Sequence, residues 1–134
     1  MTRSTGPSLT TRFGALIVVQ AAHSVEEVAG RLWESFPPAR FVSGLVSSDL
    51  ERGFLLLNLA LVAFGAWCYF WPVRQDWPAA RRIALIWAGV ETVNGIGHPL
   101  WSLRQGGYTP GTITAPVLLI LAVALATGIL RRRS

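Results

Sequence analysis

Four apolar segments, separated by polar and charged residues, set the pattern of this chain. They run from about residue 13 to 33, 53 to 73, 80 to 103 and 108 to 130. Each is close to the ~20 residues that an α-helix needs to cross a hydrocarbon core about 30 Å thick. The pattern predicts an all-α fold, with residues 1–134 forming a single domain built as a four-helix transmembrane bundle.

Polar side chains interrupt the first and third segments, and each set falls on one helix face. The spacings are i, i+3, i+4 in the first segment and i, i+3, i+7 in the third. The residues are His23, Glu26 and Glu27 in the first set, and Glu91, Asn94 and His98 in the second. One buried acid in a membrane helix costs about 2.5–3.5 kcal/mol on insertion scales. Two such sets in one small protein therefore predict a functional site.

The two polar sets are expected at the same depth, because the first and third helices cross in the same direction. A rise of 1.5 Å per residue places His23 ~15 Å and Glu91 ~16 Å from the inner ends of their helices. We therefore predict that the two faces meet between these helices. The same rise places His98 ~10 Å above Glu91. A kink at Pro99, or a second ion, would be needed for both side chains to bind metal.

Composition supports a membrane protein and excludes two other classes. Hydrophobic residues make up 51% of the chain and charged residues 14%, against about 25% charged in soluble domains. The net charge of +5 does not indicate nucleic-acid binding, because the arginines lie between the apolar segments and no binding motif accompanies them. With one cysteine, Cys68, the chain has neither an intrachain disulfide nor a cysteine-based metal cluster.

The arginine distribution predicts that the N-terminus and the C-terminus both lie on the cytoplasmic side of the cell membrane. Positive residues concentrate on the cytoplasmic side of multi-pass proteins. With four crossings, one side holds Arg3, Arg12, Arg74, Arg81, Arg82, Arg131, Arg132 and Arg133, and the other holds Arg31, Arg40, Arg52 and Arg104. The longest connection, about residues 34–51, then faces outward, and its apolar residues predict a piece that lies on the membrane surface.

The polar residues also form a recognisable combination of motifs. His-x-x-Glu-Glu occupies residues 23–27, Glu91 precedes Asn-x-x-x-His at residues 94–98, and Tyr-Thr-Pro-Gly occupies residues 108–111. Over nearly the whole chain this combination resembles the HXXEE family of small bacterial integral membrane proteins. The resemblance implies a four-helix membrane protein that shares the two polar sets. That family has no established activity, so the resemblance supports the site and not a reaction.

We interpret the site first as the centre of a membrane-embedded, metal-dependent enzyme, a hydrolase or an oxidoreductase acting on a small apolar or lipid-like substrate. Imidazole and carboxylate ligands suit zinc, iron or manganese, and a bound divalent metal would offset the cost of burying several carboxylates. The expected metal ligands are His23, Glu26, Glu27, Glu91 and His98, with Glu27 and Glu91 as catalytic groups. Supporting contacts are expected from Asn94, Gln20, Asn58 and Tyr108.

Three other interpretations stay open. Metal-free acid–base chemistry, such as isomerisation or cyclisation of an isoprenoid or another lipid, would use a carboxyl group kept protonated by burial, with Trp87 facing a carbocation. Transport of protons, metal ions or a small solute would need a homo-oligomer, because four short helices enclose only a small pore. The third interpretation is purely structural: the polar cluster joins the helices through hydrogen bonds, worth ~0.6 kcal/mol each on average in one measured membrane protein.

Overall fold

Capping residues set the ends of the long helices. The computed structural model describes residues 8–132. Helix α1 spans Leu9–Ala29, and the Ser8 hydroxyl accepts a hydrogen bond from the backbone N–H of Thr11 at its start. Helix α4 spans Leu50–Cys68 and begins at Asp49, whose carboxylate accepts from the backbone N–H of Arg52. Such side-chain acceptors satisfy N–H groups that have no partner inside the helix. A π-helical turn, η1 (Tyr69–Val73), continues α4.

Helix α5 spans Ala80–Gln105 and is one continuous helix. Pro99 lies inside it without ending it. The helix ends at Gly106, which has φ +77°, a left-handed conformation that glycine adopts without a steric penalty. Helix α6 spans Ala115–Leu130. It was predicted to begin near residue 108, but Gly111 has φ +95°, so the chain cannot be helical there. Residues 106–114 form a connecting segment instead.

Two short helices fill the connection between α1 and α4. The first predicted helix was expected to reach residue 33, but α1 ends at Ala29 because Arg31 adopts a left-handed backbone conformation with φ 56°. Helix α2 (Leu32–Ser35) and helix α3 (Pro37–Val46) follow. Helix α3 packs closely on α4, because a Cβ atom at Gly53 would overlap the Ser43 carbonyl.

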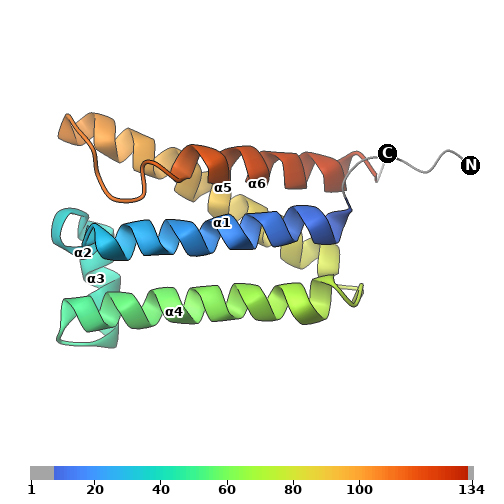
Figure 1. Ribbon diagram of the computed structural model, residues 1–134, viewed down its shortest axis with the longest axis horizontal. Coiled ribbons are helices and arrows are strands. Elements are labelled where there is room, and N and C mark those ends of the chain that lie inside the picture. Colours follow the sequence, from blue (N-terminus) through green and yellow to red (C-terminus); the bar gives the residue numbers. More distant parts are fainter. Residues whose placement is uncertain (1–7, 133–134) are drawn as a thin grey trace, which may run out of the picture.

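The four long helices form one bundle. Helix α1 lies between α4 and α6, and α5 crosses behind them (Figure 1). The start of α1 and the end of α6 lie at one end of the bundle, and α2 and α3 lie at the other end (Figure 1). The main hydrophobic core joins all four helices, with Phe13 and Leu16 of α1, Cys68 of α4, Trp87 of α5 and Leu118 of α6 among its buried residues. A smaller core under α2 and α3 contains Leu32, Trp33, Ala39 and Phe54.

The structure confirms an all-α fold, since no strand occurs among residues 8–132. It does not confirm four transmembrane helices or a multi-pass membrane protein. By length and composition, one of the described helices, Leu50–Val73, is long and apolar enough to cross a membrane. The other three long helices lack this length or composition. Helices α1 and α5 carry ionisable residues, and α6 has only 16 residues.

Candidate functional site

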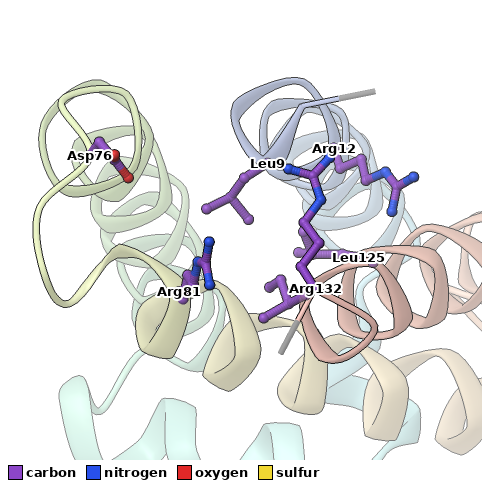
Figure 2. Close-up of a pocket in the computed structure, with 8 residues that line it drawn as sticks. Leu9, Arg12, Asp76, Arg81, Leu125 and Arg132 are labelled. Atoms are coloured by element: carbon purple, nitrogen blue, oxygen red, sulfur yellow. The ribbon is translucent and has the colours of Figure 1, made fainter. Parts of the chain in front are cut away.

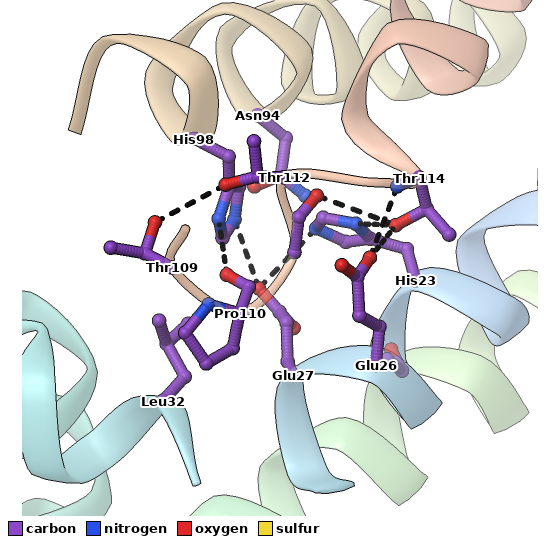
Figure 3. Close-up of polar contacts among 12 residues, drawn as sticks. His23, Glu26, Glu27, Leu32, Asn94, His98, Thr109, Pro110, Thr112 and Thr114 are labelled. Carbon is purple, nitrogen blue, oxygen red and sulfur yellow. Dashed lines mark hydrogen bonds and ion pairs between the residues drawn. The ribbon is translucent and has the colours of Figure 1, made fainter. Parts of the chain in front are cut away.

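Two histidines and one glutamate from α1 and α5 come together near one end of the bundle (Figure 3). The Oε1 atom of Glu27 lies 3.3 Å from Nε2 of His23 and 3.1 Å from Nε2 of His98. The two imidazole rings stand nearly perpendicular, with centroids 4.7 Å apart. One donor atom from each of the three side chains lies within 4.8 Å of the other two, and all three side chains are buried. We call these residues the His–Glu–His cluster.

The outer nitrogen of each imidazole is held by a hydrogen bond. His98 Nδ1 lies 2.9 Å from the carbonyl oxygen of Pro110, which can only accept, so Nδ1 donates. His23 Nδ1 lies 2.6 Å from the Thr114 hydroxyl. That hydroxyl donates its one proton to the Glu26 carboxylate at 2.5 Å, so it accepts from His23. Both neutral imidazoles therefore carry their proton on Nδ1.

The inner nitrogens consequently present lone pairs to Glu27. The Nε2 atom of His23 is buried and makes no hydrogen bond within the described part of the chain. Three electron-pair donors facing one another in a buried space repel unless a proton or a cation lies between them. Histidines that bind metal usually donate their second N–H to a carbonyl or carboxylate, which fixes the tautomer. The contacts to Pro110 and to Thr114 have this arrangement, so the cluster fits a divalent metal.

The segment 106–114 covers the cluster. A Cβ atom at Gly111 would overlap the His98 ring and lie 2.9 Å from Cε1 of His23. The segment also packs on the end of α1, because a Cβ atom at Gly30 would lie 2.5 Å from Cγ of Pro110. Hydrogen bonds between the Ser102 hydroxyl of α5 and the hydroxyls of Thr109 and Thr112, at 2.6 and 2.5 Å, fix its path. The segment thereby shields both imidazoles, of which His23 is fully buried and His98 is 6% exposed.

Glu26 faces this segment and not the His–Glu–His cluster. Its carboxylate accepts from the backbone N–H groups of Ile113 and Thr114, both at 3.0 Å, and from the Tyr108 hydroxyl at 3.0 Å. With the Thr114 hydroxyl, it has four donors. The contacts to residues 113 and 114 place a negative charge at the N-terminus of α6, which favours the helix. Desolvation and the adjacent Glu26 carboxylate raise the pKa of the Tyr108 phenol, which therefore stays a donor at neutral pH.

Glu91 lies next to the cluster but has its own partners. It is completely buried, and it interacts electrostatically with His23, Glu27 and His98. The Asn94 amide donates to its Oε2 atom at 3.3 Å. With the Gln20 amide oriented to accept from Ser24, its nitrogen lies 2.7 and 2.9 Å from the two Glu91 oxygens. Gln20 and Asn94 thus hold the Glu91 carboxylate and do not reach the histidines.

Two further residues from the sequence analysis lie outside this network. The Asn58 amide donates to the Phe54 carbonyl of its own helix at 3.1 Å, and no hydrogen bond joins it to the cluster within residues 8–132. Trp87 packs in the main core, with its ring centroid 6.5 Å from that of Phe13 and 6.0 Å from that of Phe64. Trp87 therefore does not face the cluster as the carbocation interpretation requires.

Three residues that position the histidines were missed by the analysis of polar spacing. They are Pro110, Gly111 and Thr114. The Tyr-Thr-Pro-Gly sequence marks the segment, but nothing local to the sequence shows that a backbone carbonyl from it reaches His98. Thr114 is an ordinary polar residue before an apolar helix, so its contact with His23, 91 residues away, has no local sequence pattern.

An apolar groove opens beside His98. It has a volume of about 340 Å³ and is lined by Phe36, Val90, Val93, Asn94, Gly97, His98 and Trp101. Binding sites for small molecules are mostly apolar with a few polar groups. The groove therefore offers a path by which a small apolar molecule reaches the edge of the cluster.

Comparison with known protein families identifies the family of this chain. Neither the curated proteins nor the solved structures contain a match to this chain. The family model described as "Protein of unknown function with HXXEE motif" matches residues 15–126. This range includes the motif residues His23, Glu26 and Glu27, together with His98 and the segment 106–114. The chain belongs to the HXXEE family.

Proposed function

We propose that this protein is a metal-dependent membrane enzyme that acts on a small apolar or lipid-like substrate at the His–Glu–His cluster. One observation carries the proposal: two imidazoles with their outer N–H groups held by hydrogen bonds direct their Nε2 lone pairs toward one buried carboxylate. A divalent cation satisfies all three groups at once. Hydrogen bonding between helices alone would not account for this arrangement, because within the described residues Nε2 of His23 makes no hydrogen bond although it faces the Glu27 carboxylate at 3.3 Å.

Exposed apolar side chains support placement in a membrane. In the 18-residue apolar window of the Leu50–Val73 helix only 28% of residues are buried, whereas the core helix of a soluble protein is mostly buried. Large hydrophobic side chains are also exposed on α1, α5 and α6, for example Val25, Val93 and Ile120. Contiguous apolar surface of this kind marks contact with a membrane or with another protein. A lipid bilayer would cover the exposed apolar side chains of all four long helices.

The ligand set favours zinc, iron or manganese. Two histidines and one carboxylate leave coordination positions open, as in catalytic zinc sites and in the facial triad of non-haem iron enzymes. Such a metal supplies either Lewis acidity with an activated water or dioxygen chemistry. The chain contributes the ligands, the segment 106–114 that excludes water, and the groove that admits substrate.

Glu91 is the residue that we assign to proton transfer. It is buried beside the cluster and is not one of the three converging donors. Gln20 and Asn94 orient its carboxylate. An oriented carboxylate beside the cluster can accept a proton and return it during the reaction. Glu27 instead serves as a metal ligand.

Elemental analysis tests the proposal directly. The protein is purified in mild detergent without a metal-affinity step, beside His23→Ala, Glu27→Gln and His98→Ala variants. We expect about one zinc, iron or manganese per chain in the wild type and loss of that metal in all three variants, because each removes one of three ligands. Glu91→Gln is the matched control and should keep the metal. Equal metal content in the wild type and the three variants would refute the metal centre.

One observation favours a second candidate, metal-free acid–base chemistry. The Glu27 Oε1 atom lies within 3.3 Å of both Nε2 atoms, so a proton on each Nε2, with both histidines donating to the Glu27 carboxylate, would also satisfy the cluster. A wild-type protein that stays free of metal after reconstitution, yet isomerises a lipid and loses that activity in Glu27→Gln, would establish this candidate in place of the first.

A further inference from the structure

A pocket lined by three arginines lies at the end of the bundle opposite the His–Glu–His cluster. It has a volume of about 200 Å³ and brings together Arg12 of α1, Arg81 of α5 and Arg132 after α6. Figure 2 shows Arg81 on one side of the pocket and Arg12 and Arg132 on the other, with Leu9 between them. Along α1, Arg12 is about 17 Å from His23 at 1.5 Å per residue. The pocket is therefore separate from the proposed metal centre.

Within the part of the chain that the structure describes, the positive charge of this pocket is not balanced. Asp76 is the one carboxylate among the lining residues, against three guanidinium groups. Within residues 8–132, none of the three arginines forms an ion pair with a carboxylate. Like charges held close together repel, more strongly where apolar side chains reduce the local dielectric constant. An anion between the guanidinium groups would remove this repulsion.

The structure holds one of the arginines in place before any ligand binds. Arg12 donates from Nη1 to the Ala124 carbonyl of α6 at 3.1 Å. Its guanidinium rests on Gly128, where a Cβ atom would overlap it. The remaining lining residues of α1 and α6, Leu9, Leu125 and Ile129, are apolar. The pocket thus combines a fixed guanidinium, two arginines on other elements and an apolar floor.

Helix α5 adds to the positive potential at the same place. Its first residue is Ala80, directly before Arg81. The N-terminus of a helix carries a partial positive charge and unpaired N–H groups. Arginine pairs with phosphate through two parallel hydrogen bonds, and several arginines around one pocket are typical of phosphate recognition.

We propose that this pocket binds a phosphate group, either the headgroup of an anionic phospholipid or a free phosphate. The two sources share the charge and the hydrogen-bond geometry that the arginines recognise. A phospholipid would also place its apolar part against Leu9 and Ile129. Since the proposal uses none of the residues of the metal centre, it stands or fails independently of the proposed function.

Binding of two probes to the full chain in detergent tests the proposal. The first probe is inorganic phosphate, measured by calorimetry. The second is phosphatidylglycerol, measured by native mass spectrometry against phosphatidylcholine. The test variants are Arg81→Gln and Arg132→Gln, neither of which loses a hydrogen bond within the described chain. Arg82→Gln is the matched control, because Arg82 lies beside Arg81 and outside the pocket.

We expect each test variant to bind at least one probe about tenfold more weakly than the wild type. Arg82→Gln should change binding less than about threefold, because an exposed charge outside the site has a weak effect. Binding of phosphate alone identifies a free phosphate site. Selective retention of phosphatidylglycerol identifies a headgroup site. Absence of binding of both probes to the wild type, or an equal loss in Arg81→Gln and Arg82→Gln, would overturn the proposal. Because metal content should stay unchanged in every variant, failure here is distinguishable from failure of the metal centre.

Discussion

At the scale of single residues, two adjacent glutamates of α1 serve different partners. Side chains of neighbouring helix positions leave the axis about 100° apart. The Glu27 carboxylate therefore reaches the histidines, whereas that of Glu26 reaches residues 108–114. The Thr114 hydroxyl links the two sets of contacts, because it donates to Glu26 and accepts from His23. Glu26 thus orients the His23 ring through one intervening residue.

Replacement of Glu26 by glutamine tests whether Glu26 holds residues 108–114 in place and is not itself a metal ligand. We expect Glu26→Gln to lower the free energy of unfolding by about 1–2 kcal/mol, because a hydrogen bond to a charged group contributes about 1.5–3 kcal/mol and this carboxylate is partly exposed. The glutamine amide would also face the N–H groups of residues 113 and 114. Thermal melts and elemental analysis measure the two effects. Metal content should stay near that of the wild type, and its loss with an unchanged melting temperature would contradict the assigned role.

Polar spacing predicts part of this residue-level picture. The spacing of His23 and Glu27 by one helix turn, and the matched depth of α1 and α5, indicated that these faces meet. The spacing could not separate Glu26 from Glu27, since both fit one helix face. The contacts that decide between them come from residues 108–114, far away in sequence. Long-range contacts with a non-helical segment leave no periodic pattern.

At the scale of elements, the segment 106–114 acts as a fixed cover for the cluster. Gly111 is its central requirement, because the backbone there has φ +95° and passes directly over both imidazoles. A side chain at this position is excluded twice, by backbone conformation and by space. The segment also supplies the Pro110 carbonyl that holds His98.

An added methyl group at Gly111 should displace the cover. We expect Gly111→Ala to cost at least about 1–2 kcal/mol from the left-handed backbone alone, and to weaken metal binding at least tenfold by moving the Pro110 carbonyl, since loss of such an orienting contact typically costs 10–100-fold. Metal titration and thermal melts measure both effects. Gly89→Ala is the matched control, because a Cβ atom at Gly89 meets nothing within 4 Å and alanine favours a helix interior. Similar metal affinities of the two variants would show that the cover does not hold the site.

Helix positions were largely predictable, and helix ends were less so. Apolar runs located α1, α4, α5 and α6, because burial and membrane insertion both require them. The start of α6 was wrong because Tyr108 and Ile113 extend the apolar pattern into a segment that Gly111 keeps non-helical. The connection at residues 34–51 was predicted as one piece, but the turn at Arg31 separates α2 from α1, and the extended backbone at Phe36 separates α2 from α3.

At the scale of the whole molecule, the bundle has two chemically different ends. The His–Glu–His cluster, its cover and the helices α2 and α3 lie at one end, and the arginine pocket, the start of α1 and the end of α6 lie at the other (Figure 1). Arginine is enriched on the cytoplasmic side of membrane proteins. If the bundle spans a membrane, this asymmetry corresponds to the predicted orientation, with the arginine pocket inside and the proposed metal centre toward the outer face.

Cysteine labelling tests this orientation across the whole chain. In a Cys68→Ala background, Ser48→Cys places one thiol between α3 and α4, and Gln75→Cys places one between η1 and α5; both positions are exposed. If the bundle crosses the membrane with its termini inside, a membrane-impermeant maleimide should label Ser48→Cys in intact cells and Gln75→Cys only after permeabilisation. The two positions flank opposite ends of the same apolar helix, Leu50–Val73. A single crossing by that helix therefore already places the two thiols on opposite sides of the membrane. Labelling of both thiols in intact cells would contradict the crossing, and reversed accessibility would contradict the orientation drawn from the arginines.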